Sequence, residues 1–247
     1  MGLPTARGGV GGARMGARAA AAMLVDTQPA TYQHVPASPE VRDHWVESQL
    51  IGVLMDNLGP SVLAGALSLP LIVFFMAGEV HTAGLVVWTL AMLGLLVFRY
   101  RLIGVYRLRY DNVDGPQRPI FLRRYLWTWA AAGFLWGGAV ALSYLQASLT
   151  TQVVCALVVL GQGLLNLTAF SASLPVYRTY AHALTLSVLL GLVAATAGHV
   201  DEPQVVQASV VFAVLLGAFW LLLLVAGSRL HQVHRASFEL QFSNQEL

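Results

Sequence analysis

Six stretches of apolar residues, separated by short polar segments, make up most of the chain after residue 58. Each stretch, as a helix, is long enough to cross about 30 Å of hydrocarbon. The stretches cover residues 60–78, 82–98, 125–145, 151–170, 175–197 and 205–227. This pattern predicts an all-α, polytopic membrane protein whose six transmembrane helices lie within residues 59–227.

The segment before the first apolar stretch divides into two parts. Residues 1–40 are rich in glycine, alanine and arginine and lack the apolar core of a signal peptide, so we expect them to be disordered. Residues 41–58 mix apolar and charged side chains, as in a helix that lies in the membrane interface. We expect Gly59 and Pro60 to turn the chain from this interfacial helix into the first span.

After residue 227 the chain carries the seam of a heptad repeat, in which spacings of three and four residues alternate. The seam positions are Leu230, Val233, Ser237, Leu240, Asn244 and Leu247. Leucine at d positions and a polar asparagine at an a position favour a parallel two-stranded coiled coil. Residues 228–247 are therefore predicted to form a cytoplasmic signalling helix that joins two copies of the chain. The alternative is a single helix with an irregular apolar stripe.

The arginines predict the orientation in the membrane. From residue 41 onward the chain has eleven arginines, which precede the first span, separate the second from the third, open the fifth or follow the sixth. Because basic residues concentrate on the cytoplasmic side, both termini are predicted to be cytoplasmic. Seven of the eleven arginines lie in the loop 99–124, which we expect to contact lipid headgroups.

Composition narrows the class of protein further. With 57% hydrophobic and 11% charged residues, the chain has too much apolar surface for one soluble domain. The bilayer is the expected partner, and no nucleic acid is expected. The single cysteine, Cys155, excludes an internal disulfide or a cysteine-based zinc site. The sequence contains no phosphate-binding glycine loop, H-E-x-x-H or G-x-S-x-G motif, so we predict neither catalytic residues nor a cofactor.

Polar side chains inside the predicted spans are candidates for a ligand pocket. Gln152, Gln162 and Asn166 recur on one face of the fourth span, and polar groups at that depth face the bundle interior or a cavity. Trp136 in the third span and His182 in the fifth complete this set. The alternative to a pocket is interhelical hydrogen bonding.

A second set of candidates lies in the short loops predicted on the outer face. It consists of Glu79, His81, His199, Asp201 and Glu202. Two histidines and three carboxylates have the chemistry to bind a divalent cation, but their spacing matches no metal motif. We therefore predict no metal site, and solvated loop charges are the alternative to a sensing role.

Three stretches carry a resemblance to a known family: FLWGG at 134–138, GLLNLTAFSASLPVY at 163–177 and RLHQVHRASFELQFSN at 229–244. They resemble the six-span N-terminal sensor region of proteobacterial signalling proteins, over about residues 45–247. There the region precedes a sensor histidine kinase core, often a hybrid one, or a diguanylate cyclase domain. No kinase or cyclase motif follows the predicted coiled coil, so the resemblance implies only input and transmission.

The resemblance thus implies a sensory, signal-transmitting module in the bacterial inner membrane. It also implies a homodimer that acts on a kinase, response regulator or cyclase module, with the output domain absent from this chain. The alternatives are a small transporter and a membrane scaffold. A transporter would need a pair of broken spans in corresponding positions, for which Pro70 is one candidate.

Overall fold

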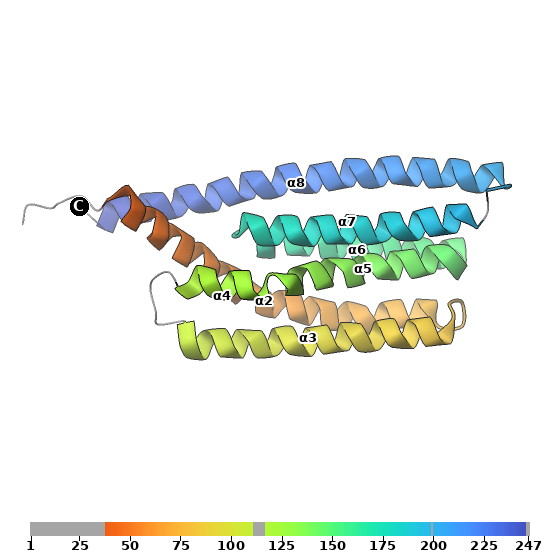
Figure 1. Ribbon diagram of the computed structural model, residues 1–247, viewed down its shortest axis with the longest axis horizontal. Coiled ribbons are helices and arrows are strands. Elements are labelled where there is room, and N and C mark those ends of the chain that lie inside the picture. Colours follow the sequence, from red (N-terminus) through yellow and green to blue (C-terminus); the bar gives the residue numbers. More distant parts are fainter. Residues whose placement is uncertain (1–37, 111–116, 199, 246–247) are drawn as a thin grey trace, which may run out of the picture. The chain divides into compact units, whose positions relative to one another are not determined.

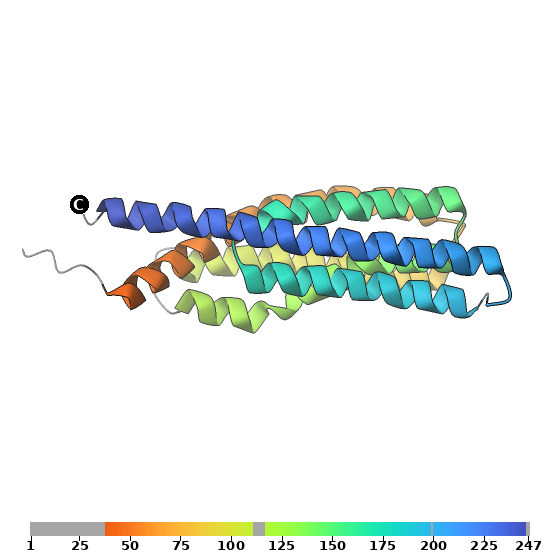
Figure 2. The same ribbon diagram turned by 90° about the horizontal axis from the view of Figure 1, so that it is seen from above.

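The computed structural model describes residues 38–110, 117–198 and 200–245, and within these ranges the chain is all-α, as predicted. The helices run side by side as a bundle (Figures 1 and 2). They are α2 (Pro39–Met76), α3 (Thr82–Tyr110), α4 (Gln117–Tyr125), α5 (Trp127–Gln146), α6 (Leu149–Phe170), α7 (Leu174–Ala197) and α8 (Pro203–Gln245).

Six helical stretches are long and apolar enough to cross a membrane: α2, α3, α4 together with α5, α6, α7 and α8. Large apolar side chains on these helices point away from the bundle, and Leu67, Phe74 and Val214 are 71%, 75% and 67% exposed. Such a surface suits lipid, because apolar side chains need no hydrogen-bond partners and the helices satisfy their backbone hydrogen bonds internally. The six predicted spans are confirmed, and the chain is a multi-pass membrane protein.

Helix α2 joins the predicted interfacial helix and the first span into one element. It begins at Pro39, where the Ser38 hydroxyl accepts a hydrogen bond from the Val41 amide at 3.4 Å. The turn predicted at residues 59–60 is wrong, because α2 continues through Pro60 and only changes direction (Figure 1). A proline removes one helical hydrogen bond and bends a helix without necessarily ending it. The rest of the predicted disordered segment, residues 1–37, lies outside the described residues.

All eleven arginines after residue 40 belong to parts of helices that gather at one end of the bundle (Figure 1). These parts are the start of α2, the second half of α3, α4, the first turns of α7 and the last part of α8. We call this end the arginine-rich end. The opposite end carries the connections α2–α3, α5–α6 and α7–α8; the first of these includes Gly78, whose φ of 86° suits glycine.

The helices α5 and α7 pack backbone against backbone. A Cβ atom on Gly133 would overlap the Tyr180 carbonyl oxygen and lie 2.9 Å from the Leu184 amide nitrogen. A Cβ atom on Gly137 would lie 2.8 Å from the Ser187 Cβ atom. Small residues let transmembrane helices approach this closely, and the gain in van der Waals contact holds the pair together.

Helix α8 packs more loosely over its membrane-spanning part. A groove of about 230 Å³ separates it from α5, α6 and α7 and is lined by apolar residues that include Val159 and Phe212. A second groove, of about 270 Å³, lies between α7 and α8 beside His182 and Trp220. The tight contact on α8 is Gly227, where a Cβ atom would overlap the ring of Tyr177.

Candidate functional site

Polar side chains from α2, α6 and α7 form a hydrogen-bonded polar cluster inside the bundle. The Ser61 hydroxyl donates to Asn166 Oδ1 at 2.7 Å, and Asn166 Nδ2 donates to the Tyr180 hydroxyl at 2.9 Å. One turn away, Gln162 Nε2 donates to Ser68 Oγ at 2.7 Å and to the Ala64 carbonyl oxygen at 3.1 Å. These bonds tie α6 to α2 and α7, since unpaired polar groups are costly at this depth.

A buried arginine adjoins the polar cluster. Arg99 on α3 is only 3% exposed, and its guanidinium carbon lies 5.6 Å from the Trp129 ring centre and 5.1 Å from that of Phe170. Phe170 in turn packs edge-on against Tyr180 at 5.3 Å. The Nε and Nη2 atoms of Arg99 have no hydrogen-bond partner among the described residues. Cation–π contact with these two rings offsets part of the cost of burying the charge.

The last part of α8 docks on the first part of α2 at the arginine-rich end. We call this contact the junction, formed by Asp43, Trp45, Arg235, Phe238 and Phe242. Arg235 Nη2 donates to Asp43 Oδ1 at 3.0 Å, and both side chains are about half exposed. The Trp45 ring lies 6.3 Å from that of Phe238 and 5.4 Å from that of Phe242. Since an exposed ion pair contributes about 1 kcal/mol or less, the aromatic contacts hold the junction and the ion pair sets its register.

His231 links the junction to the connection between α6 and α7. Its Nδ1 atom lies 3.1 Å from the Ser171 carbonyl oxygen and 3.2 Å from that of Ala172. Carbonyl oxygens only accept hydrogen bonds, so Nδ1 carries the proton in this arrangement. Helix α8 is thus connected to α2 and to the α6–α7 turn at the same level of the bundle.

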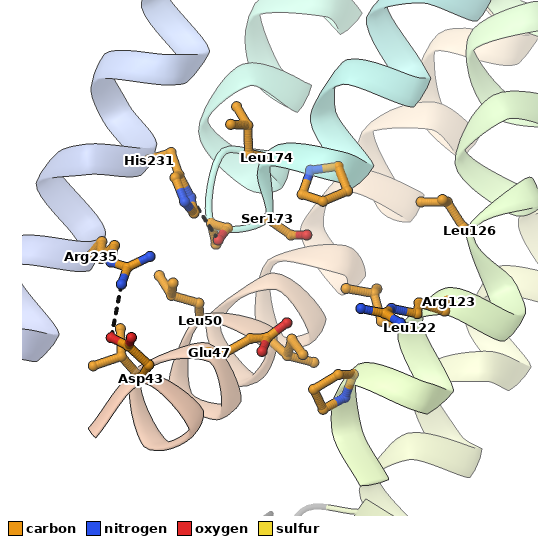
Figure 3. A pocket seen from close by; sticks show the side chains of 15 residues that line it. Asp43, Glu47, Leu50, Leu122, Arg123, Leu126, Ser173, Leu174, His231 and Arg235 are labelled. Carbon is orange, nitrogen blue, oxygen red and sulfur yellow. Dashed lines mark hydrogen bonds and ion pairs between the residues drawn. The ribbon is translucent and has the colours of Figure 1, made fainter. Parts of the chain in front are cut away.

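A pocket of about 510 Å³ lies beside the junction, between α2, α4, the start of α7 and α8 (Figure 3). Apolar side chains such as Leu50, Leu122 and Leu174 form part of its wall. Charged side chains also line it: Asp43, Glu47, Arg123 and Arg235. We call it the junction pocket. Its mixed lining suits a ligand with one apolar and one charged part.

Only some residues of the predicted ligand pocket in the spans lie together in the structure. Gln162 and Asn166 share the polar cluster, and Trp136 is buried on α5 against Gly65 of α2. Gln152 instead donates to the Ala147 carbonyl oxygen next to the start of its own helix. His182 does not face the interior as predicted. It lies on the exposed side of α7, where it accepts a hydrogen bond from Trp220 Nε1 at 3.2 Å.

The predicted outer-face set is not assembled either. Glu79 accepts hydrogen bonds from the backbone and hydroxyl of Ser148, and the His81 amide donates to Gln146 Oε1 at 2.6 Å. The first loop therefore contacts the α5–α6 connection rather than the third loop, where Asp201 and Glu202 are exposed. His199 lies outside the described residues. Among those described, no three His, Cys, Asp or Glu side chains form a group suited to a metal ion.

The bonds to Ser148 also perturb the Glu79 carboxyl. The backbone hydrogen bond from Ser148, and then that from its hydroxyl, hold the pKa of Glu79 below its ordinary value. Both bonds favour the charged form, and this carboxylate lies at the start of α6, where the helix dipole favours negative charge.

Two arginines of the loop 99–124 do not contact headgroups as predicted. Arg99 is buried in the bundle, and Arg118 is 6% exposed because its Nη1 atom donates to the Ser48 carbonyl oxygen at 3.0 Å. The sequence carried a signal for the first of these, since Arg99 belongs to a series of buried positions on α3 with alternating spacings of three and four residues. The other members of the series are Met92, Leu95, Leu102 and Tyr106.

The predicted dimer seam lies on a face of α8 that the bundle leaves uncovered. Val233 and Leu240 are 64% and 66% exposed, Asn244 is exposed and Leu230 is half-buried. The residues that dock on the rest of the chain, such as Phe238 and Phe242, point in another direction because each residue turns a helix by about 100°. Leu247 lies outside the described residues. A second chain therefore has access to the seam while the junction stays formed.

The chain matches no protein-family model, no curated protein and no solved structure. The functional argument therefore proceeds from the geometry of the bundle.

Proposed function

We propose that this protein is a membrane-embedded sensory and signal-transmitting module that acts on a cytoplasmic kinase or cyclase module. The observation that carries the proposal is the continuity of α8, which runs without interruption from Pro203 to Gln245. One helix thus connects the end of the bundle opposite the arginines to the segment that docks at the junction. Any shift or rotation of α8 in the membrane reaches its last turns directly.

The packing of α8 supports this role. Grooves lie on two sides of its membrane-spanning part, whereas Gly227 packs tightly against Tyr177. A helix that is held at one point and loosely packed beyond it has room to pivot. A stimulus shifts such a two-state element only if it binds the two positions of α8 with different affinity.

Homodimerisation through the exposed seam completes the proposal. Val233 and Leu240 offer apolar surface to a second copy, and Asn244 would set the register of the pair. In a Cys155→Ala background, Leu240→Cys should crosslink two chains faster than Ser243→Cys, which is also exposed but lies off the seam. Equal crosslinking rates at the two positions would contradict a defined seam.

The function is tested by fusing residue 245 in register to a kinase or cyclase core and inserting one to seven residues at the fusion point. If α8 transmits a rotation, activity should vary with the number of inserted residues and return after about seven, which is one heptad. Activity that is independent of the insertion length would exclude transmission through α8. The matched control is a fusion of the same core to a single unrelated transmembrane helix, with the same series of insertions at the fusion point.

The role of the junction's ion pair can be tested in the same fusion protein. Asp43→Arg should change the basal activity because it sets two positive charges against each other. Adding Arg235→Asp should restore part of the parental activity, since the pair with residue 43 is re-formed with its charges exchanged, while Glu239, 2.8 Å from Arg235 in the wild-type chain, loses its own partner. A double variant that behaves like the single one would show that this contact does not determine the position of α8.

A further inference from the structure

The junction pocket holds two charged side chains that have no ion-pair partner among the described residues. Glu47 of α2 and Arg123 of α4 point toward one another across the pocket (Figure 3). Neither belongs to the ion pairs found in the described part of the chain, whereas Asp43 is paired with Arg235 at 3.0 Å. The pocket thus presents one free negative and one free positive group on opposite walls.

The pocket also has an apolar part and a defined place in the membrane. Leu50, Leu122 and Leu126 line it beside the charged groups. It lies at the arginine-rich end, where α7 begins at Leu174. This is the level at which lipid headgroups meet a membrane-spanning bundle. The first turn of α7 adds the partial positive charge of a helix N-terminus.

We propose that the junction pocket binds the headgroup of a zwitterionic membrane lipid with a primary ammonium group, of the phosphatidylethanolamine class. Arg123 and the first turn of α7 hold the phosphate, and Glu47 accepts hydrogen bonds from the ammonium group. The apolar wall contacts the glycerol and the first part of the acyl chains. Because this lipid bridges α2, α4, α7 and α8, it fixes α8 in the docked position.

The charges argue against two other lipid classes. An anionic headgroup would bring its negative charge close to Glu47 with no ammonium group to balance it. A choline headgroup cannot donate a hydrogen bond to a carboxylate, and quaternary ammonium groups are recognised by aromatic cages. The described residues that line this pocket include no Phe, Tyr or Trp.

The test measures bound lipid on the purified full chain by native mass spectrometry. The probes are phosphatidylethanolamine, phosphatidylcholine and phosphatidylglycerol with identical acyl chains. We expect the wild-type chain to retain the ethanolamine lipid in preference to the other two. Arg123→Gln should reduce its retention by about tenfold, as expected for one lost charge-assisted hydrogen bond. Glu47→Gln should remove the preference over phosphatidylglycerol.

Arg124→Gln is the matched control, because Arg124 is the next residue, is also exposed and does not line the pocket. It should change retention by about twofold or less. Protection of the buried thiol of Cys155 from labelling confirms that each variant is folded. The assay does not depend on signalling, so its outcome is separate from that of the fusion experiment.

Three results would overturn the proposal. One is equal retention of the ethanolamine lipid by the wild-type chain and both pocket variants. Another is equal retention, by the wild-type chain, of the ethanolamine lipid and of phosphatidylcholine or phosphatidylglycerol. The third is displacement of the lipid by an equal concentration of glycerophosphoethanolamine, which would assign the pocket to a water-soluble ligand.

Discussion

The α5–α7 pair and helix α8 are both made of apolar membrane-spanning helix, yet they pack in opposite ways. In the pair, Gly133 and Gly137 bring the backbones of α5 and α7 into direct contact. Along α8, Gly217 faces open space, and grooves lie on two sides of the helix. Hydropathy also differs between these regions, because α8 is the most apolar of the six spans and the spans of α5 and α7 are the least apolar. The difference shows that α5 and α7 are held in direct contact, whereas the packing leaves space beside α8.

The largest expected loss of stability comes from adding a side chain at the contact between α5 and α7. Gly133→Val should destabilise the protein by about 3 kcal/mol, because its side chain would overlap the α7 backbone, which cannot move aside. Thermal unfolding is measured through labelling of Cys155, which is the single cysteine and is fully buried. Gly161→Val on α6 is the control, since no atom of the described part of the chain lies within 4 Å of a Cβ atom there. A Gly133 variant as stable as the control would contradict the rigid pair.

Two glycines of α8 lie in differently packed parts of the helix, Gly227 at the tight contact and Gly217 in the loosely packed part. Gly227→Val should cost about 2 kcal/mol because its side chain would displace the buried ring of Tyr177. Gly217→Val, in contrast, should change stability by about 0.5 kcal/mol or less. The same labelling assay compares the two variants. If both substitutions were equally costly, α8 would be packed evenly along its length and would have no pivot.

A smaller effect is expected in the polar cluster that ties α6 to the rest of the frame. Asn166→Leu removes the hydrogen bonds to Ser61 and Tyr180 and should cost about 1 kcal/mol, since such bonds average about 0.6 kcal/mol each in membranes. Gln152→Leu is the control, because among the described residues its side-chain amide bonds only to Ala147, near the start of its own helix. An Asn166 variant with unchanged stability and an altered response in the fusion would assign this side chain to sensing.

The smallest effect concerns the end of the bundle opposite the arginines. The pKa of Glu79 is held below its ordinary value by hydrogen bonds from Ser148, so this carboxylate stabilises the fold above the ordinary carboxyl pKa. The contribution is lost as the pH falls through the lowered pKa. The stability difference between the wild-type chain and Glu79→Gln should therefore shrink between about pH 6 and pH 3. A difference that stays constant over this range would show that the charge of Glu79 does not support the contact.

Part of the candidate site could be predicted from the sequence. Asn166 and Gln162 lie inside an apolar span, so the sequence predicts that they face protein, and both are buried in the polar cluster. Their partners Ser61, Ser68 and Tyr180 could not be identified, because serine and tyrosine also occur in spans without such a role. The junction was missed for a different reason. Asp43 and Arg235 are 192 residues apart, and no local pattern pairs residues at that separation.

The number of spans, their approximate extent and the grouping of the arginines could all be read from the amino-acid sequence. These properties follow from hydropathy and charge along the chain, because the bilayer acts on each helix separately. The folded chain was needed to learn which helices touch, that Arg99 and Arg118 are buried, and that α8 docks on α2. Lipid is as apolar as the helix surfaces, so hydrophobicity does not choose among helix pairings. The choice rests on the fit of small residues, aromatic rings and a few polar groups that are distant in the sequence.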